Sequence, residues 1–349
     1  MGHQTALGSR VYKWDNAKFV LILLVVFGHC IDLYYSQSGL VRCLFMSIYT
    51  FHMPAFLFLS GLFAKSAVNK GSFPWQKVIS YLLLYVLMEL LYYFTRYLIG
   101  GEHVIELNLL EEIGVPWYSL AMAFFFALLY MMRNTDPRKV LPILLVLGCL
   151  AGYVEQLGDY LVLARVVYFY PFFYLGYCLD VQKLYAFLNK WWVRLIAILV
   201  LVGFAVFMLT QYPEWRWFRP LLTGRNGFDS LGEREPYGAL YRAGLYVVSF
   251  VLSLSLLAVM PNGKIPLISV GGQRTMAVYV FHHLPIFVFK ASPWMAMLGT
   301  LRPRYFVLIL AGASLVLTGV CCLKIFTTIL RPFIDWQAAH RWFLKKEKE

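Results

Sequence analysis

A histidine lies deep inside the first long apolar segment of the chain, which runs from Lys18 to His29. An ionisable ring at that depth is costly to hold in hydrocarbon, so such residues are rare and usually functional. A neutral imidazole is the usual general base near neutral pH, and it suits the removal of a proton from a sugar hydroxyl that attacks an acyl thioester. We expect His29 to be catalytic; the alternative is a structural histidine bonded to a neighbouring helix.

A lysine precedes this histidine on the same segment. Lys18 and His29 are eleven residues apart, which in a helix returns to nearly the same face about 16 Å along the axis. One face would then carry a cation near the membrane boundary and a proton acceptor inside. This arrangement suits a long anionic molecule whose reactive end is buried. The alternative for Lys18 is an interfacial ion pair with Asp15.

Other apolar segments carry titratable groups at a similar estimated depth, namely His52, Glu89 and the adjacent pair His282 and His283. Buried ionisable groups tend to pair or to line cavities, so a shared site is expected. Adjacent helical side chains point about 100° apart, so at most one of the pair is expected to face a given cavity. We assign His282 to the substrate.

His52 and Glu89 are expected to orient or assist the catalytic base. Each has a simpler alternative. The His52 ring could instead bond a backbone carbonyl freed by Pro54, and Glu89 could pair with Arg96.

The composition indicates an integral membrane protein. Hydrophobic residues make up 60% of the 349 residues and charged residues only 14%, against about 25% charged in soluble proteins. The cysteines lie in or beside apolar runs without metal-ligand spacing, so we expect reduced thiols and no metal. The chain has no Gly-X-Ser-X-Gly, Walker or His-Glu-X-X-His motif, which favours direct base-catalysed transfer over a serine acyl-enzyme.

Hydropathy predicts an all-α fold, a polytopic membrane helix bundle of about ten transmembrane helices. Each span is about long enough for a hydrocarbon core of roughly 30 Å. The spans cover approximately residues 17–35, 43–65, 77–99, 115–132, 138–154, 163–180, 191–210, 239–260, 268–290 and 304–330. They form the core, 17–330, of a single domain with an N-terminal segment, 1–16, and a basic tail, 331–349. The loop 211–238 is rich in Trp, Arg and Pro and is expected to cap the bundle or face the substrate.

Loop charge predicts the orientation. With the N-terminus in the cytoplasm, the inner segments hold most of the Lys and Arg residues, and an outer loop holds Glu102, Glu106, Glu111 and Glu112. This is the positive-inside pattern of an inner-membrane protein with both termini cytoplasmic. Only loop 211–238 and the loop around Arg302 depart from it. The net charge of +13 therefore reflects orientation, and no nucleic-acid partner is expected.

Five short motifs together resemble a known family. They are Asp15-Asn16-Ala17-Lys18 before Phe27-Gly28-His29, Phe51-His52-Met53-Pro54, Pro116-Trp117-Tyr118-Ser119-Leu120, Tyr170-Pro171-Phe172-Phe173-Tyr174-Leu175-Gly176-Tyr177 and Gly271-Gly272-Gln273-Arg274. In this order, over about residues 10–290, they resemble the integral-membrane acyltransferases of the acyltransferase-3 family. The fucose 4-O-acetylase-like branch is the most similar.

The resemblance implies that acyl-CoA, most simply acetyl-CoA, enters from the cytoplasm. Its acyl group would pass to a carbohydrate hydroxyl of the cell envelope, for example on a lipid-linked glycan. His29 would be the catalytic histidine and Lys18 would help to hold the donor. Trp117 and His282 are expected at the substrate.

One departure from the family concerns the donor phosphates. Many relatives carry an Arg-X-X-Arg pair at the start of the third helix, where this chain has only Lys70 and Lys77 as cations. We expect these lysines and Arg274 to contribute donor contacts.

The interpretation is a membrane O-acyltransferase of envelope polysaccharide. The alternatives are a transporter or flippase of a lipid-linked or acylated glycan, which also needs intramembrane polar groups, and a membrane scaffold. The sequence leaves open the acceptor sugar, acetyl against a longer acyl group, and the oligomeric state.

Overall fold

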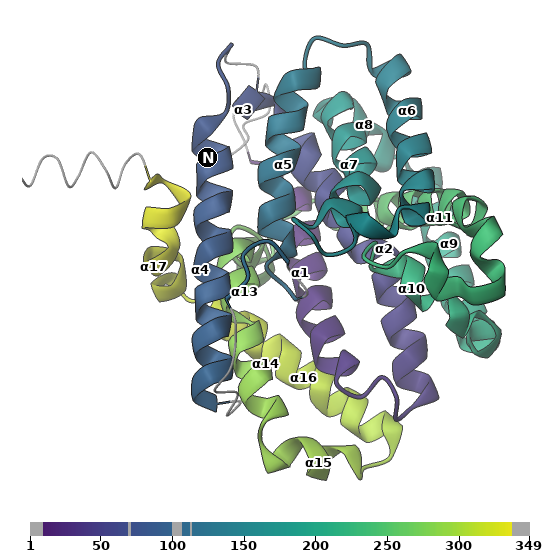
Figure 1. Ribbon diagram of the computed structural model, residues 1–349, viewed down its shortest axis with the longest axis vertical. Helices are drawn as coiled ribbons and strands as arrows, with labels where there is room; N and C mark the ends of the chain where they lie inside the picture. The colour runs from purple at the N-terminus through teal and green to yellow at the C-terminus, as the bar shows by residue number, and fades with distance from the viewer. Residues whose placement is uncertain (1–9, 69–70, 100–106, 112–113, 337–349) are drawn as a thin grey trace, which may run out of the picture.

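The computed structural model describes residues 10–68, 71–99, 107–111 and 114–336. These residues fold into a bundle of helices with no strand (Figure 1). Helix α1 (Tyr12–Asp32) runs through the middle of the bundle and packs against α2, α12 and α16. The predicted all-α membrane bundle is confirmed.

Six helices in the described part of the chain are long and apolar enough to cross a membrane. They are α1, α2 (Gly39–Leu62), α4 (Trp75–Ile99), α9 (Trp191–Gln211), α11 (Gly238–Val259) and α16 (Pro303–Cys321). Three shorter helices stand beside them, α5 (Trp117–Met132), α6 (Pro137–Leu150) and α7 (Leu163–Cys178). The count of ten spans stays a prediction.

The predicted ninth span is broken into three short helices, α12 (Pro266–Gly272), α13 (Thr275–Phe281) and α14 (His283–Lys290). The first break follows two glycines. It brings Gly272 so near to α1 that a Cβ there would lie 1.8 Å from the carbonyl oxygen of Asp15. The second division falls at His282, where the φ and ψ angles of −64° and −32° remain helical, so α14 continues from α13 without a sharp turn. Broken helices at membrane depth are typical of places where backbone lies against protein or a cavity.

The predicted tenth span also differs, because the chain turns at Leu323 and continues as α17 (Lys324–Ile334). This helix lies against α4, where Ser80 donates to the Ile334 carbonyl and Gln76 donates to Asp335. Ile325 remains exposed, as in a helix that lies along a membrane surface.

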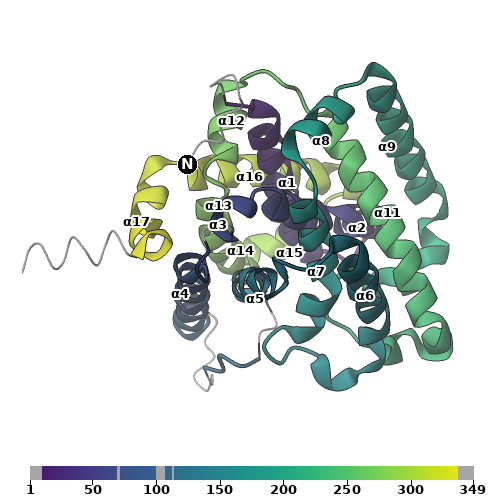
Figure 2. The same cartoon turned by 90° about the horizontal axis from the view of Figure 1, so that it is seen from above.

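The remaining short elements join the longer helices. They are α3 (Lys65–Val68), α8 (Val181–Leu188), α10 (Arg219–Leu222), α15 (Pro293–Gly299), and the 3₁₀ turns η1 (Ala151–Tyr153), η2 (Glu155–Leu157), η3 (Tyr212–Phe218) and η4 (Phe228–Tyr237). Seen along the bundle, α9 and α11 form one edge, whereas α17 lies at the other (Figure 2).

Helices α2 and α7 cross closely. A Cβ at Gly176 would lie 2.1 Å from the Phe58 carbonyl oxygen, so only glycine permits this approach. Small residues at such crossings are typical of membrane helix packing. The contact fixes α2, which carries His52, against α7, which carries Arg165.

Buried polar side chains fasten the start of α1. Lys13 has no exposed surface and donates to the carbonyl oxygens of Ala258 and Met260 at the end of α11. Asn16 donates to the carbonyl oxygens of Pro261 and Gly263. A cation at a helix C-terminus satisfies free carbonyls and interacts favourably with the negative end of the helix dipole. Lys13 is therefore a structural residue.

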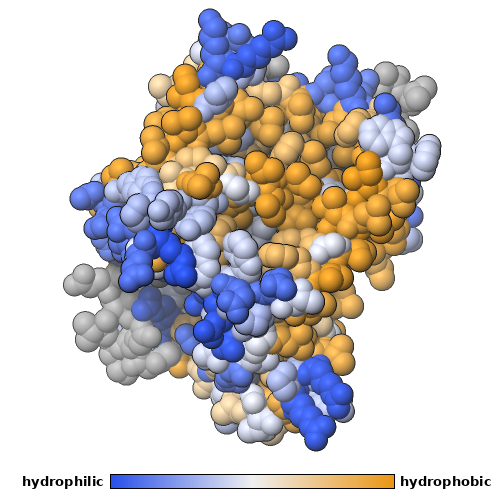
Figure 3. All heavy atoms as spheres, turned by 90° about the vertical axis from the view of Figure 1, so that its right-hand side faces the viewer, coloured by the Kyte–Doolittle hydropathy of each residue, from blue (hydrophilic) through white to orange (hydrophobic). Residues whose placement is uncertain are grey.

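The outer surface of the bundle is strongly apolar. Over α9 and α11 exposed side chains such as Leu199, Leu209 and Val247 are each more than 60% accessible. Figure 3 shows this face as a broad hydrophobic area with hydrophilic residues gathered at its ends and along one side. An exposed apolar area of this extent is expected to contact lipid.

Candidate active site

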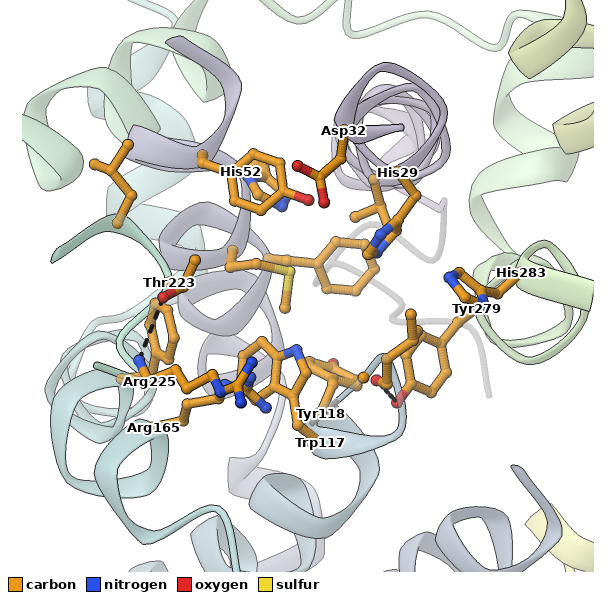
Figure 4. A pocket seen from close by; sticks show the side chains of 18 of the residues that line it. His29, Asp32, His52, Trp117, Tyr118, Arg165, Thr223, Arg225, Tyr279 and His283 are labelled. Carbon is orange, nitrogen blue, oxygen red and sulfur yellow. Dashed lines mark hydrogen bonds between the residues drawn. The ribbon is translucent and has the colours of Figure 1, made fainter. Parts of the chain in front are cut away.

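A cavity of about 500 Å³ opens between α1, α2, the start of α5, α7 and the 219–226 segment. Figure 4 shows its principal side chains. Its titratable and polar lining residues in the described part of the chain are His29, Asp32, Tyr49, His52, Trp117, Tyr118, Arg165, Arg219, Thr223, Arg225, Asn226, Thr275, Tyr279 and His283. The remaining lining is mostly apolar, from Ile22 and Val25 on α1 to Phe169 on α7.

Three histidines from two separate segments meet beside this cavity. The ring centroid of His29 lies 5.4 Å from that of His282 and 5.4 Å from that of His283. Tyr92 of α4 approaches His283 to 5.1 Å. The structure therefore brings together groups that the sequence could place only at a common depth.

His282 is held in one orientation. Its Nδ1 lies 2.9 Å from the Val278 carbonyl oxygen and 3.0 Å from that of Tyr279. Carbonyl oxygens only accept, so Nδ1 carries the proton and Nε2 is left as an acceptor. Nε2 is buried and has no hydrogen-bond partner among the described residues.

The histidine that lines the cavity is not the one that was predicted. His282 was expected to face the substrate, but it has no exposed surface and does not line the cavity. His283 lines it instead. The physical reason is helix geometry: His282 keeps helical φ and ψ angles of −64° and −32°, so the side chain of His283 points about 100° away from that of His282, and the Nδ1 bonds hold the His282 ring within the protein.

His52 lines the cavity from α2. Its Nδ1 donates to the Ile48 carbonyl at 2.8 Å, which leaves Nε2 as an acceptor. The carbonyl that Pro54 frees belongs to Thr50, four residues earlier, and Ser249 of α11 donates to it. The alternative that His52 serves this carbonyl is therefore wrong.

Lys18 lies one helical turn before Ile22, a residue of the cavity wall on α1. Its Nζ is 4.9 Å from the centre of the Phe63 ring. Asp15 is paired with Arg10, through contacts of 2.6 and 3.0 Å. The expected alternative of an Asp15–Lys18 pair is thus replaced by an Asp15–Arg10 pair.

The other predicted donor contacts lie away from the cavity. Lys77 is exposed in the first turn of α4, and Lys70 lies outside the described residues. Arg274 donates to the Cys322 carbonyl at 2.7 Å and so caps the end of α16. Their assignment to the donor stays a prediction, which this geometry does not favour.

Glu89 does not line the cavity either. It lies one turn before Tyr92 on α4, on the side of the helix that approaches His283. A supporting role for Glu89 therefore stays a prediction.

Trp117 lines the cavity at the first residue of α5. Phe169 stacks on its ring at a centroid distance of 5.2 Å, and the Arg165 guanidinium lies 5.2 Å from the ring centre. Tyr279 holds the start of α5 in place, since its hydroxyl donates to the Val115 carbonyl and accepts from the Ser119 backbone. Substrate binding by Trp117 stays a prediction, and its place in the cavity wall favours it.

Four charged residues of the cavity were not predicted from the sequence: Asp32, Arg165, Arg219 and Arg225. Asp32 lies one turn after His29 and accepts from Arg219 at 3.2 Å. Its spacing from His29 was a signal for Asp32, and the departure of loop 211–238 from the positive-inside pattern was a signal for Arg219 and Arg225, whereas Arg165 had no such signal. Gly224 lets this loop fold back, with a φ of +65° and a Cβ position only 2.3 Å from the Tyr168 ring.

A helix bundle with histidines grouped around a polar cavity at membrane depth has the architecture of an intramembrane enzyme. The model of the acyltransferase-3 family, described as an acyltransferase domain, matches residues 11–326. The chain belongs to this family and is a membrane acyltransferase. No curated protein and no solved structure matches it. Family membership favours an enzyme over the carrier and scaffold alternatives, and the fucose 4-O-acetylase-like branch stays a prediction.

Proposed function

We propose that this acyltransferase moves an acyl group, most simply acetyl, from acyl-CoA to a hydroxyl of an envelope carbohydrate, with His29 as general base. The observation that carries the proposal is the position of His29. Its ring lines the cavity, and its centroid lies 5.4 Å from that of a buried second histidine, His282.

In the proposed reaction the proton of the acceptor hydroxyl passes through His29 to the CoA thiolate. One ring nitrogen of His29 takes the proton of the acceptor hydroxyl while the oxygen attacks the thioester carbonyl carbon. The carbon–sulfur bond then breaks, and the departing CoA thiolate takes the proton from the imidazolium. The products are an O-acyl ester and CoA, and His29 returns to its neutral form.

His282 acts in this scheme as a positioning residue. Its Nε2 can only accept, and in this scheme it accepts the His29 N–H when the substrates bind, which selects the tautomer of His29. The second His29 nitrogen is then the proton acceptor on the cavity side. The Nε2 of His52 is a further hydrogen-bond acceptor in the same cavity. We propose that it binds the sugar hydroxyl that is acylated or a neighbouring hydroxyl of the same sugar.

Donor entry is proposed from the end of the bundle at which α1 begins. Lys18 lies one turn from the cavity wall there and can meet a phosphate of CoA. The positive-inside pattern makes this end cytoplasmic. The acceptor then approaches from the end at which α1 finishes, in the inner membrane.

Acyl transfer is tested with the purified protein in lipid nanodiscs, acetyl-CoA labelled in its acetyl group, and an envelope glycan extract. The proposal predicts release of CoA and label bound to carbohydrate as an ester. Glycan translocation in proteoliposomes without any labelled ester would contradict it and support a carrier.

A further inference from the structure

The cavity lining is rich in arginine. Arg165 at the start of α7, Arg219 of α10 and Arg225 of the following turn all belong to it, and Arg219 reaches Asp32 at the end of α1. Asp32 is the one acidic residue among the described lining residues. Figure 4 shows Arg165 and Arg225 beside Trp117, across the cavity from His29.

The arginines are fixed by their surroundings. Arg165 is only 5% exposed and lies over the Trp117 ring. The Arg219 guanidinium lies 3.8 Å from the centre of the Tyr35 ring. Arg225 bonds Asp159 through Nε at 2.7 Å. Planar guanidinium groups held in this way are pre-organised for carboxylate or phosphate.

Arg219 remains available to a ligand. Its single bond to Asp32 is 3.2 Å long, and both side chains are about 40% exposed (42% and 41%). An ion pair as open as this contributes little to stability, and a guanidinium has five donors. An incoming anion can therefore bind Arg219 without loss of a buried interaction.

From this wall we infer that the acceptor is anionic, a glycan that carries a carboxylate or phosphate close to the acylated sugar. The sugar ring would lie against Trp117, since the negative face of an indole attracts polarised C–H groups. Its anion would meet Arg219 and Arg225. The inference rests on the proposed function.

The donor phosphates are a less suitable ligand for these arginines. Arg219 bonds Asp32 at the last residue of α1, whereas Lys18 lies fourteen residues earlier on that helix, or about 21 Å along its axis. The arginines thus lie at the end of α1 opposite to the proposed donor entry.

The first experiment separates the envelope glycan extract by anion exchange into acidic and neutral pools and incubates each with the nanodisc protein and labelled acetyl-CoA. We expect the label in the acidic pool. Label confined to the neutral pool would overturn the inference while leaving acyl transfer intact. Label in neither pool, without CoA release, would contradict the proposed function itself.

Chemical treatment of the acidic pool identifies the anionic group of the acceptor. Carboxyl reduction before the assay removes acceptor activity if the anion is a carboxylate, whereas phosphatase or mild acid treatment removes it if the anion is a phosphate. Acceptor activity that survives all three treatments would overturn the inference.

The second experiment measures Arg219→Gln with the acidic pool. The KM for the acceptor should rise about ten-fold, with the KM for acetyl-CoA unchanged. Arg219→Lys should restore part of the loss, and Arg302→Gln, an exposed arginine outside the cavity lining, should have no effect. A rise in the KM for acetyl-CoA alone would mean that these arginines bind the donor, and would overturn the inference.

Discussion

At the residue scale, the proposed chemistry depends on a neighbour of His29 with no exposed surface. Two backbone carbonyls fix His282, its remaining nitrogen is buried without a hydrogen-bond partner among the described residues, and its ring centroid lies 5.4 Å from that of His29. The sequence predicted His29 and His52 because an ionisable residue stands out within an apolar run, and it predicted Trp117 because its motif resembles one of the family. It could not separate His282 from His283, because tertiary packing decides which side of this helix faces the cavity.

We predict that His282→Phe lowers kcat roughly ten- to a hundred-fold, since His29 loses the acceptor that selects its tautomer. The KM for each substrate should stay within about two-fold of the wild-type value. His282→Gln, whose amide oxygen can accept, should recover part of kcat. Steady-state kinetics of the purified variants make the comparison, and equal loss in the Phe and Gln variants would indicate a packing role only.

At the element scale, the site depends on helices that cross closely and on helices that break. Gly176 allows α2 and α7 to cross within backbone contact, and the short helices α13 and α14 place Tyr279 and His283 on the cavity. Hydropathy predicted apolar segments in these places. It could not predict that 268–290 is three helices, because all three remain apolar.

We predict that Gly176→Ala lowers the free energy of unfolding of the protein in detergent by roughly 1–3 kcal/mol. The new methyl group would collide with the Phe58 carbonyl and force the helices apart. Gly203→Ala is the matched control, since a Cβ there meets no atom within 4 Å. The melting temperatures should differ clearly between the two variants. Equal melting temperatures would contradict the close crossing.

At the scale of the whole molecule, the proposed function assigns the two ends of α1 to two different substrates. The start of α1 is tied to the end of α11 by Lys13 and Asn16, and its far end joins the arginine-rich wall through Asp32. The positive-inside pattern predicts that the start of α1 is cytoplasmic, and this orientation stays a prediction. The exceptions to the pattern, Arg219 and Arg225 in loop 211–238, prove to line the cavity, so a departure from an orientation rule marked part of the candidate site.

The orientation is tested by cysteine labelling in intact cells. Ser72 and Thr300 are both exposed and lie in connections at opposite ends of the bundle. A membrane-impermeant maleimide should label Thr300→Cys in intact cells and Ser72→Cys only after the inner membrane is permeabilised. The unsubstituted chain controls for the native cysteines, and the reverse labelling would invert the proposed topology.

The central claim is that the His29 ring takes the proton from the acceptor. Its most direct test is His29→Ala in nanodiscs, with CoA release and ester formation followed together and with acetyl-CoA binding and melting temperature measured on the same sample. We predict a loss of ester formation of at least about a hundred-fold, with donor binding and folding retained. Full transfer activity in the folded variant would contradict the claim.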